Sequence, residues 1–352
     1  MPWAFLLLCF SGAQLAFPGR CSVRELLHFQ QPGNESREAA AGHTEKLFQW
    51  FMAKHNRSYA AGSPEFIHKY QVFQESTQRY YTMNLISSNL SNGRDSAIYG
   101  INQFSDLPPE EFRATYLGSR SMQLPKYISF PKDTKSPALP PKFDWRDKNV
   151  VTPVRNQESC GGCWAFSVVE SIESSYAIKG EQLEMLSAQE VIDCSYRDAG
   201  CNGGSPISAL MWLSQSKAKL MKESVYPFNA KTGMCHYFPR STFGVSITSY
   251  KAYSFRYSEE VMMQKLLEWG PLVAVVDAVS WQDYLGGIIQ HHCSEEKSNH
   301  AVLITGYDKT GDIPYWIVRN SWGTKWGIDG YVYIKMGKNV CGIADSVAVG
   351  IV

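Results

Sequence analysis

Residues 156–167, NQESCGGCWAFS, place two cysteines three residues apart, directly before an apolar run that is typical of a helix. This spacing occurs in redox-active dithiols and in pairs of cysteines that supply half of the ligands of a metal site. It also occurs where a nucleophilic cysteine follows a structural cysteine. A nucleophilic thiol needs a pKa well below its usual value, and a helix N-terminus and a neighbouring imidazolium both lower it. Because Cys163 begins the helical run and Cys160 lies one turn earlier in a glycine-rich loop, the chemistry favours Cys163 as the nucleophile.

The cysteine count also predicts a reactive thiol. The first residues, MPWAFLLLCFSGAQLAF, hold a short apolar core followed by small residues, which predicts a secretory signal peptide over residues 1–17. Of nine cysteines, Cys9 lies inside this segment and Cys21 lies just after it. The other seven are Cys160, Cys163, Cys194, Cys201, Cys235, Cys293 and Cys341. An odd number in an oxidising compartment leaves one thiol unpaired, although parity does not say which one.

A catalytic thiol also needs a proton acceptor and a group that orients it. His300, in KSNHAVLITGY, opens an apolar strand, and Asn320 lies in VRNSWGTKWG. They follow Cys163 by 137 and 157 residues. Only the fold can therefore bring these three side chains together.

The apolar pattern predicts helices on both sides of a polar linker. Helices are expected over residues 44–57, 63–88, 163–179 and 258–269, and from Ser187 and Ser205 onward. Pro64 in a first turn, Gly180 as a stop, and Ser187 with Glu190 as a capping box indicate three helix ends. Residues 18–42 are expected to be loosely ordered, and residues 118–141, rich in Ser, Lys and Pro, predict an exposed linker suited to proteolysis.

Strands are expected near the C-terminus, in PLVAVVD, AVLITGY, YWIVRN and YVYIKM, between glycine and aspartate turns. The pattern therefore predicts an α+β protein in which a helical half packs against a mostly antiparallel sheet half. The formal net charge is only +1 and no basic stripe occurs, which argues against nucleic acid and acidic membrane surfaces as partners. No segment after the first is long and apolar enough to cross a bilayer.

Several motifs resemble, in order, those of the papain family of cysteine proteases. Residues 139–352 contain Q-x-x-C-G-G-C-W-A-F-S at 157–167, C-N-G-G at 201–204, N-H-A-V at 299–302 and N-S-W-G at 320–323. Upstream, G-I-N-Q-F-S-D at 100–106 fits the family's propeptide fully. The long helical propeptide signature fits in part: Glu65, Lys69, Phe73 and Asn84 hold, whereas Ser76 and Tyr80 replace the expected Asn and Ile. Gly162 stands where most relatives carry serine or alanine.

The resemblance implies roles for individual residues. Cys163 would be the nucleophile, His300 the proton donor and acceptor, and Asn320 the group that orients the imidazole. Gln157 would donate its side-chain amide to the oxyanion beside the Cys163 backbone N–H, and Trp322 would cover the Asn320–His300 hydrogen bond. The implied disulfides are Cys160–Cys201, Cys194–Cys235 and Cys293–Cys341, which leaves Cys163 free.

The resemblance also implies a substrate site. Gly204 would make backbone hydrogen bonds to the peptide, and the S2 subsite would comprise Ser205, Pro206, Val275, Ala301 and Ser346. These residues are small or apolar, so we expect a moderately hydrophobic residue at P2 and no acidic preference. No insertion resembles the occluding loop of an exopeptidase, which favours an endopeptidase.

At the level of the whole chain, the resemblance implies an inhibitory, mainly helical propeptide at 18–138 and a mature peptidase at 139–352. The peptidase would have a helical left domain, an antiparallel β-barrel-like right domain and a cleft between them. We expect a zymogen that enters the secretory pathway and reaches the lysosome or is secreted. Its expected partners are peptide and protein substrates, its own propeptide and cystatin-type inhibitors, and a monomer is expected. Sequons predict glycans at Asn34, Asn56 and Asn89.

Other interpretations are weaker. A redox dithiol at Cys160 and Cys163 would follow a thioredoxin-like strand, whereas VTPVRNQES predicts a loop. His291, His292 and Cys293 suggest zinc, but Cys293 is needed for a disulfide and adjacent residues of a strand point apart. No metal or cofactor is therefore expected. The rival function is a non-catalytic binding protein, or a propeptide-type inhibitor of other cathepsins, and it conflicts with the presence of every catalytic residue type.

Overall fold

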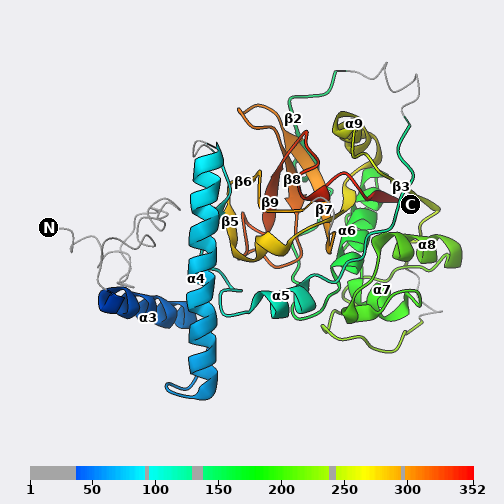
Figure 1. The fold of residues 1–352 in the computed structure, drawn as a ribbon. Helices are drawn as coiled ribbons and strands as arrows, with labels where there is room; N and C mark the ends of the chain where they lie inside the picture. The colour runs from blue at the N-terminus through cyan, green and yellow to red at the C-terminus, as the bar shows by residue number, and fades with distance from the viewer. Residues whose placement is uncertain (1–36, 92–94, 129–137, 238–242, 295–297) are drawn as a thin grey trace, which may run out of the picture. The chain divides into compact units, whose positions relative to one another are not determined.

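A computed structural model describes residues 37–91, 95–128, 138–237, 243–294 and 298–352 (Figure 1). The predicted signal peptide and the Asn34 sequon lie outside these residues. The chain divides into two compact units, residues 1–58 and 59–352. In the first unit, helix α3 spans Arg37–Lys54, so the expectation of loose order up to residue 42 was wrong at its end. The alanines at 39–41 are strong helix formers and extend the helix towards the N-terminus.

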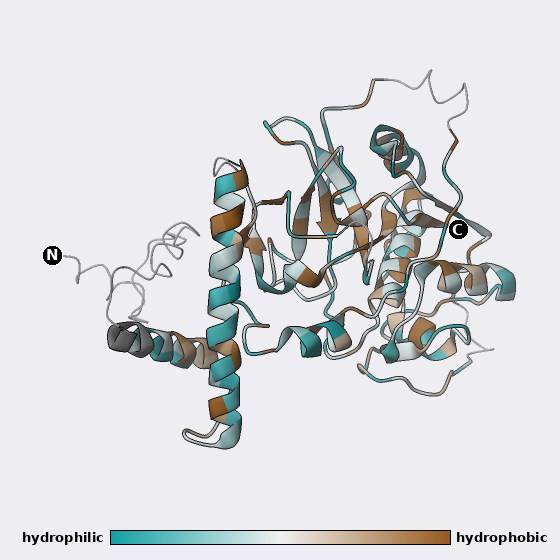
Figure 2. Cartoon of the chain, viewed as in Figure 1, coloured by the Kyte–Doolittle hydropathy of each residue, from teal (hydrophilic) through white to brown (hydrophobic). Residues whose placement is uncertain are grey.

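The second unit begins with a long helix, α4, at Pro64–Ser91. Its predicted start is confirmed, because the Ser63 hydroxyl accepts a hydrogen bond from the Phe66 N–H at 3.1 Å, as an N-cap residue does. A two-residue strand, β1 (Ile98–Tyr99), and helix α5 (Pro109–Tyr116) follow. Much of α4 is hydrophilic, whereas apolar residues concentrate in the central strands (Figure 2).

Three helices form the helical part of the second unit: α6 at Cys163–Ile178, α7 at Ala188–Cys194 and α8 at Pro206–Ser216. Every residue of α6 from Cys163 to Ser175 is buried, as expected for a helix covered on all sides. Half of the predicted capping box forms: the Ser187 hydroxyl accepts from the Glu190 N–H at 2.9 Å. The Glu190 carboxylate instead accepts from the Met221 N–H at 2.7 Å, so it connects α7 to the next loop.

An eight-stranded sheet forms the other part of this unit. Its strands are β2 (Lys142–Asp144), β3 (Ser249–Tyr253), β4 (Leu272–Val276), β6 (Ile288–Ile289), β7 (His300–Asp308), β8 (Tyr315–Arg319), β9 (Tyr331–Lys335) and β10 (Val347–Ile351). The strand order is β3-β10-β4-β7-β8-β9-β6, with β2 beside β7. All pairs are antiparallel except β6 with β9. The α+β class is confirmed, but the sheet is open between β3 and β6 rather than closed as a barrel.

The helices pack against buried strands of the sheet. β4 and β7 are buried along their whole lengths, and α6 packs against β7 and β10 (Figure 1). Helix α9 (Glu259–Trp269) also contacts β7. None of the helices in the described ranges is long and apolar enough to span a membrane.

The segment expected to be a propeptide contacts the rest of the second unit through several backbone hydrogen bonds. β1 pairs antiparallel with β5 (Tyr284–Gly286), outside the main sheet. Further on, the Ser119 N–H donates to the Asn299 carbonyl and the Arg120 N–H donates to the Gly204 carbonyl. Ser119 is buried, so the expectation of an exposed linker was wrong at its beginning.

Gly118 explains that close approach. A Cβ at this position would lie 2.1 Å from the Gly161 carbonyl oxygen, and only glycine avoids that collision. What resembled a flexible linker in composition is therefore a tight backbone contact.

Candidate active site

Cys163 is the first residue of α6 and is fully buried. The structure contains the disulfides Cys160–Cys201, Cys194–Cys235 and Cys293–Cys341, the same three pairs that the resemblance implied. Among the cysteines of the described residues, Cys163 is the free one. The Cys160–Cys201 bridge connects the loop just before Cys163 to the segment that precedes α8. The bridge therefore fixes the loop that leads into the N-terminus of α6, where the thiol lies.

Little space is left beside Gly162. A Cβ there would lie 2.9 Å from Ile192 Cδ1 and 3.2 Å from Cys160 Sγ. Because Cδ1 is the end of a flexible side chain, a serine or alanine at this position requires a small shift of Ile192.

His300, the first residue of β7, meets Asn320, the residue that follows β8. His300 Nε2 and Asn320 Oδ1 are 2.7 Å apart, and both residues are buried. Asn320 Oδ1 also accepts the Ser321 backbone N–H at 2.8 Å, which identifies this atom as the amide oxygen. Because an oxygen acceptor requires a donor opposite it, Nε2 carries the proton and Nδ1 is the basic nitrogen of the neutral ring.

Nδ1 is the ring atom available for proton exchange with the thiol. It is buried and makes no hydrogen bond of good geometry within the described ranges. The backbone N–H of Ala301, the residue after His300, lies beside the Cys163 thiol. The chain thus brings the histidine and the cysteine to one place.

Trp322 covers the imidazole. Its ring centroid is 4.8 Å from that of His300, with the planes 35° apart. Behind it, Trp326 lies 4.7 Å from Trp322, edge to face, and donates its indole N–H to the Trp281 carbonyl at 3.2 Å. These aromatic rings exclude water from the His300–Asn320 hydrogen bond and strengthen it.

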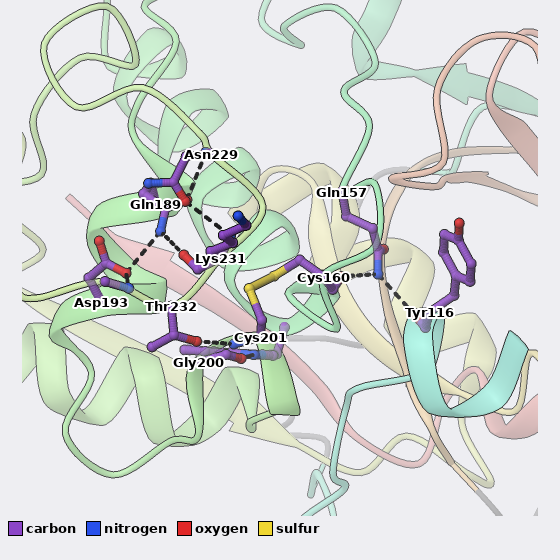
Figure 3. Close-up of a disulfide and its surroundings, with 12 residues drawn as sticks. Tyr116, Gln157, Cys160, Gln189, Asp193, Gly200, Cys201, Asn229, Lys231 and Thr232 are labelled. Carbon is purple, nitrogen blue, oxygen red and sulfur yellow. Dashed lines mark hydrogen bonds between the residues drawn. A yellow bond between two sulfur atoms is a disulfide. The ribbon is translucent and has the colours of Figure 1, made fainter. Parts of the chain in front are cut away.

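Gln157 lies between Cys160 and Tyr116 (Figure 3). Its Nε2 donates to the Cys160 carbonyl at 2.8 Å and to the Tyr116 carbonyl at 3.1 Å (Figure 3). Its Oε1 accepts the Ser321 hydroxyl at 2.6 Å. The oxygen is therefore fixed by Ser321, and the amide N–H groups are left to bind carbonyl oxygens.

The segment after α5 fills the site. The Tyr116 carbonyl, bound to Gln157, also lies close to the His300 ring. The Gly118 backbone N–H lies beside the Cys163 thiol. Gly204, expected to bind substrate backbone, instead donates its N–H to the Gly118 carbonyl at 2.9 Å. Backbone groups of residues 116–120 thus occupy the positions where a substrate peptide is expected.

This occlusion changes both pKa values in the direction that suppresses reactivity. Burial raises the pKa of the Cys163 thiol to about 11, although neighbouring backbone N–H groups pull it down. Burial also lowers the pKa of His300 to about 4, against the raising effects of Asn320 and the Tyr116 carbonyl. Both shifts favour the neutral thiol and the neutral imidazole over a thiolate–imidazolium pair in the occluded site.

The residues expected at S2 come from β4, β7, the position before β10 and the start of α8. Strand pairing places Val275 opposite Ala301, and the Val275 N–H donates to the Ser346 carbonyl at 3.1 Å. Ser205 precedes α8 and Pro206 is its first residue. All five residues are buried.

The structure separates the residues of the zinc alternative. Cys293 is bonded to Cys341, and His292 Nε2 lies 3.0 Å from the Ser87 hydroxyl. The histidines and cysteine therefore serve other contacts. Of the described sequons, Asn56 and Asn89 are both exposed.

Sequence reasoning missed two groups at this site. Ser321 orients both Asn320 and Gln157, and the only signal for it was its place inside the N-S-W-G motif. The Tyr116 carbonyl had no signal, because a backbone oxygen leaves no trace in residue type.

Comparison with known proteins identifies the chain's family. The model of the papain family cysteine protease matches residues 139–351. The chain belongs to the papain family of cysteine proteases. A second model, the cathepsin propeptide inhibitor domain, matches residues 48–112. This papain-family chain is therefore a cysteine-type endopeptidase made as a zymogen, whose partners are peptide substrates and its own propeptide.

Individual relatives agree with the family. The chain is 59% identical to human cathepsin O over 282 residues, covering 79% of this chain and 86% of that protein. It is 54% identical to mouse cathepsin O, covering 83% and 93% of the two chains. Digestive procathepsin L2 from Tenebrio molitor has a similar structure, with a TM-score of 0.78 and 32% identity over 88% of this chain and all of that chain. These comparisons provide no support for a non-catalytic binding protein.

Proposed function

We propose that Cys163, His300 and Asn320 are the catalytic residues of this peptidase, with Gln157 as an oxyanion donor and Trp322 as the cover of the imidazole. The observation that carries the proposal is the 2.7 Å contact between His300 Nε2 and Asn320 Oδ1, with the oxygen identified by Ser321. That contact directs Nδ1 away from Asn320. It leaves the basic nitrogen for the only free thiol among the described cysteines.

The reaction begins once residues 116–120 leave the site. His300 Nδ1 takes the thiol proton, and the thiolate attacks the scissile carbonyl carbon. The oxyanion forms beside the Gln157 amide and the Cys163 backbone N–H. The C–N bond then breaks, and the imidazolium gives its proton to the leaving amine.

A water molecule completes the cycle. His300 removes a proton from this water as it attacks the thioacyl carbonyl. The C–S bond breaks, the acid product leaves, and the thiolate–imidazolium pair is restored. Asn320 holds the ring in one tautomer throughout, as the third member of a triad does.

We place the end of the signal peptide near residue 17, the propeptide at 18–138 and the mature enzyme at 139–352. The boundary at 139 coincides with the start of the family match. The proposed route is the secretory pathway, ending in the lysosome or outside the cell, with glycans at Asn34, Asn56 and Asn89. A monomer inhibited by cystatin-type proteins completes the proposal.

The S2 positions Ser205, Pro206, Val275, Ala301 and Ser346 predict a P2 residue such as Leu or Phe, because they are small or apolar and offer no basic side chain. A library of peptide substrates varied at P2 measures this preference as kcat/KM. Higher values for Arg or Glu than for Leu and Phe would contradict it.

Labelling tests the nucleophile directly. The purified precursor is acidified and treated with an epoxysuccinyl inhibitor of thiol proteases, and the adduct is located by peptide mapping. We expect one adduct per chain, on Cys163, with Cys160 in a disulfide. No adduct, or a disulfide between Cys160 and Cys163, would refute the assignment and favour the binding or redox interpretation.

A further inference from the structure

The two departures from the helical signature of the propeptide flank one arginine on α4. Ser76 precedes Arg79 by one helical turn, and Tyr80 follows it directly. The Ser76 hydroxyl accepts from Arg79 Nη2 at 3.0 Å. Ser76, where the signature has asparagine, therefore orients the guanidinium.

Arg79 reaches across to the peptidase and pairs with Asp283. Its Nε donates to Asp283 Oδ2 at 2.6 Å and its Nη2 to Asp283 Oδ1 at 2.9 Å. Two parallel, charge-assisted hydrogen bonds of this kind are among the strongest and most directional in proteins. The Asp283 side chain is 1% exposed and that of Arg79 is 25% exposed, so water contributes little at the carboxylate.

Because Asp283 is buried, the ionised form of its carboxylate depends on Arg79. Burial raises the pKa of Asp283, and Arg79 opposes that effect. The other titratable groups near it are Tyr80 and Tyr99, whose pKa values are raised first by burial and then by Asp283. Without the arginine, an ionised carboxylate would be buried among phenols with no countercharge, which is costly.

Strand β1 also contacts this surface, next to the ion pair. Asp283 ends the 3-10 helix η4 (Val279–Asp283) and precedes β5, and its carbonyl accepts the Gly100 N–H at 2.8 Å. β1 pairs with β5, with Tyr99 opposite Tyr284. Asn84 connects α4 to β1, because its amide donates to the Tyr99 carbonyl at 2.7 Å and accepts the Tyr99 N–H at 2.9 Å. Arg79 and β1 therefore arrive at this surface in a fixed register.

We propose that Asp283 and the edge of β5 form a recognition surface for one kind of partner, an inhibitory segment that offers an extended strand and an arginine placed as Arg79 is. This surface fits the chain's own propeptide and rejects propeptides with an acidic or apolar residue at that position. The inference rests on the proposed function of residues 18–138 as an inhibitory propeptide, and it assigns the charge that determines which propeptide the peptidase accepts.

Hydrogen–deuterium exchange on the full-length Cys163→Ala chain tests the inference without any need for catalysis. The variants are Arg79→Glu, Asp283→Arg and the double exchange. The matched control is Arg113→Glu, which makes the same charge change at an exposed arginine on α5. We expect each single variant to speed exchange in residues 79–91, 98–99 and 284–286 by at least tenfold, because like charges then face each other. The double exchange should return the rates to within about threefold of the parent, and the control should leave them unchanged.

The outcomes separate the two claims. If the parent chain shows no protection at 98–99 and 284–286, β1 does not dock on β5 and the proposed surface does not exist; the inhibitory role of residues 116–120 is tested separately, by labelling of Cys163. If the parent is protected and Arg79→Glu behaves like Arg113→Glu, the ion pair carries no recognition. If the double exchange stays as fast as the single variants, charge is not what the surface selects.

Discussion

At the residue scale, two hydrogen bonds of Ser321 fix the chemistry of its neighbours. Its backbone N–H identifies the Asn320 oxygen, and its hydroxyl holds the Gln157 oxygen. Together they determine which tautomer His300 adopts and which atoms of Gln157 face a carbonyl. Ser321 thus positions both Asn320 and Gln157.

Ser321→Ala should lower kcat while leaving KM nearly unchanged, because it frees the Gln157 amide to rotate. Loss of a complete oxyanion donor costs about 2.7–4 kcal/mol of transition-state stabilisation, so Gln157→Ala should lower kcat by roughly 10²-fold or more and Ser321→Ala by a smaller factor. Steady-state kinetics on the acid-activated enzyme provide the measurement. The double variant should be no slower than Gln157→Ala, and additive losses would mean that Ser321 acts elsewhere.

The reactivity of Cys163 should differ between precursor and mature enzyme. With a thiol pKa raised to about 11, alkylation of the precursor should rise about tenfold per pH unit from pH 7 to 10, following the thiolate fraction. After the propeptide leaves, the helix N-terminus and the imidazolium stabilise the thiolate, and alkylation should already be fast at pH 5–6. The rate of iodoacetamide labelling against pH distinguishes the two forms. Identical profiles would show that the propeptide does not suppress the thiolate.

Residue types singled out His300 and Asn320, and the family resemblance added Gln157 and Trp322, because motif residues carry their chemistry in their side chains. In the structure Asn320 and Trp322 both contact His300, and Ser321 connects Asn320 to Gln157. The occupant of the site could not be predicted in the same way. Tyr116 and Gly118 act through backbone groups, which every residue possesses.

At the element scale, a buried ion pair connects the helix of the nucleophile to the strand that ends at Asn320. Glu170, on α6, lies 2.9 Å from Arg319, the last residue of β8, and both side chains are almost fully buried. Arg319 also donates to the carbonyls of Thr152 and Pro153, at 2.9 and 2.6 Å. This cluster holds α6 and β8 at one separation.

Glu170→Gln should therefore destabilise the fold strongly, since it leaves the Arg319 charge buried without its nearest partner. Removing one member of a buried pair typically costs about 3–5 kcal/mol of unfolding free energy. Glu170→Gln with Arg319→Met should cost less than the sum of the single variants. Urea unfolding of the Cys163→Ala precursor measures these costs, with the exposed Glu260→Gln as control. Additive costs in the double variant would show that the two side chains do not interact.

The helices and the longer strands could be predicted, because α4 carries a helical period over many residues and α6, β7 and β8 are apolar runs bounded by turn or capping residues. The short elements could not. β1 and β6 have two residues each, too few for an alternation to appear, and they form only because a distant strand pairs with them. The capping box forms only in part, because the Glu190 carboxylate accepts the Met221 N–H of the next loop instead of a backbone N–H at the start of its own helix.

At the scale of the whole molecule, the precursor is inhibited by main-chain contacts that tolerate no side chain. Gly118 lies against Gly161, and its carbonyl accepts the Gly204 N–H. Composition alone predicted a linker here, since glycine is equally common in flexible segments and in tight contacts.

Gly118→Ala should open the precursor. The added Cβ would collide with the Gly161 carbonyl, so residues 116–120 must withdraw from the site. We expect labelling of Cys163 by iodoacetamide at pH 7 to become at least tenfold faster, with the unfolding midpoint changed little. Gly311→Ala is the control, because nothing lies within 4 Å of its added Cβ. Equal labelling in the two variants would contradict the steric account.

The burial of Cys163 also has a consequence for how the folded precursor keeps its disulfides. An unpaired thiolate close to the Cys160–Cys201 bridge would attack it and scramble the pairing, because thiol–disulfide exchange proceeds through the thiolate. In the folded precursor the pKa of this thiol is raised and backbone N–H groups lie beside it, so it is a poor attacking group. The segment that closes the site thus also protects the disulfides of the described residues from exchange once they have formed.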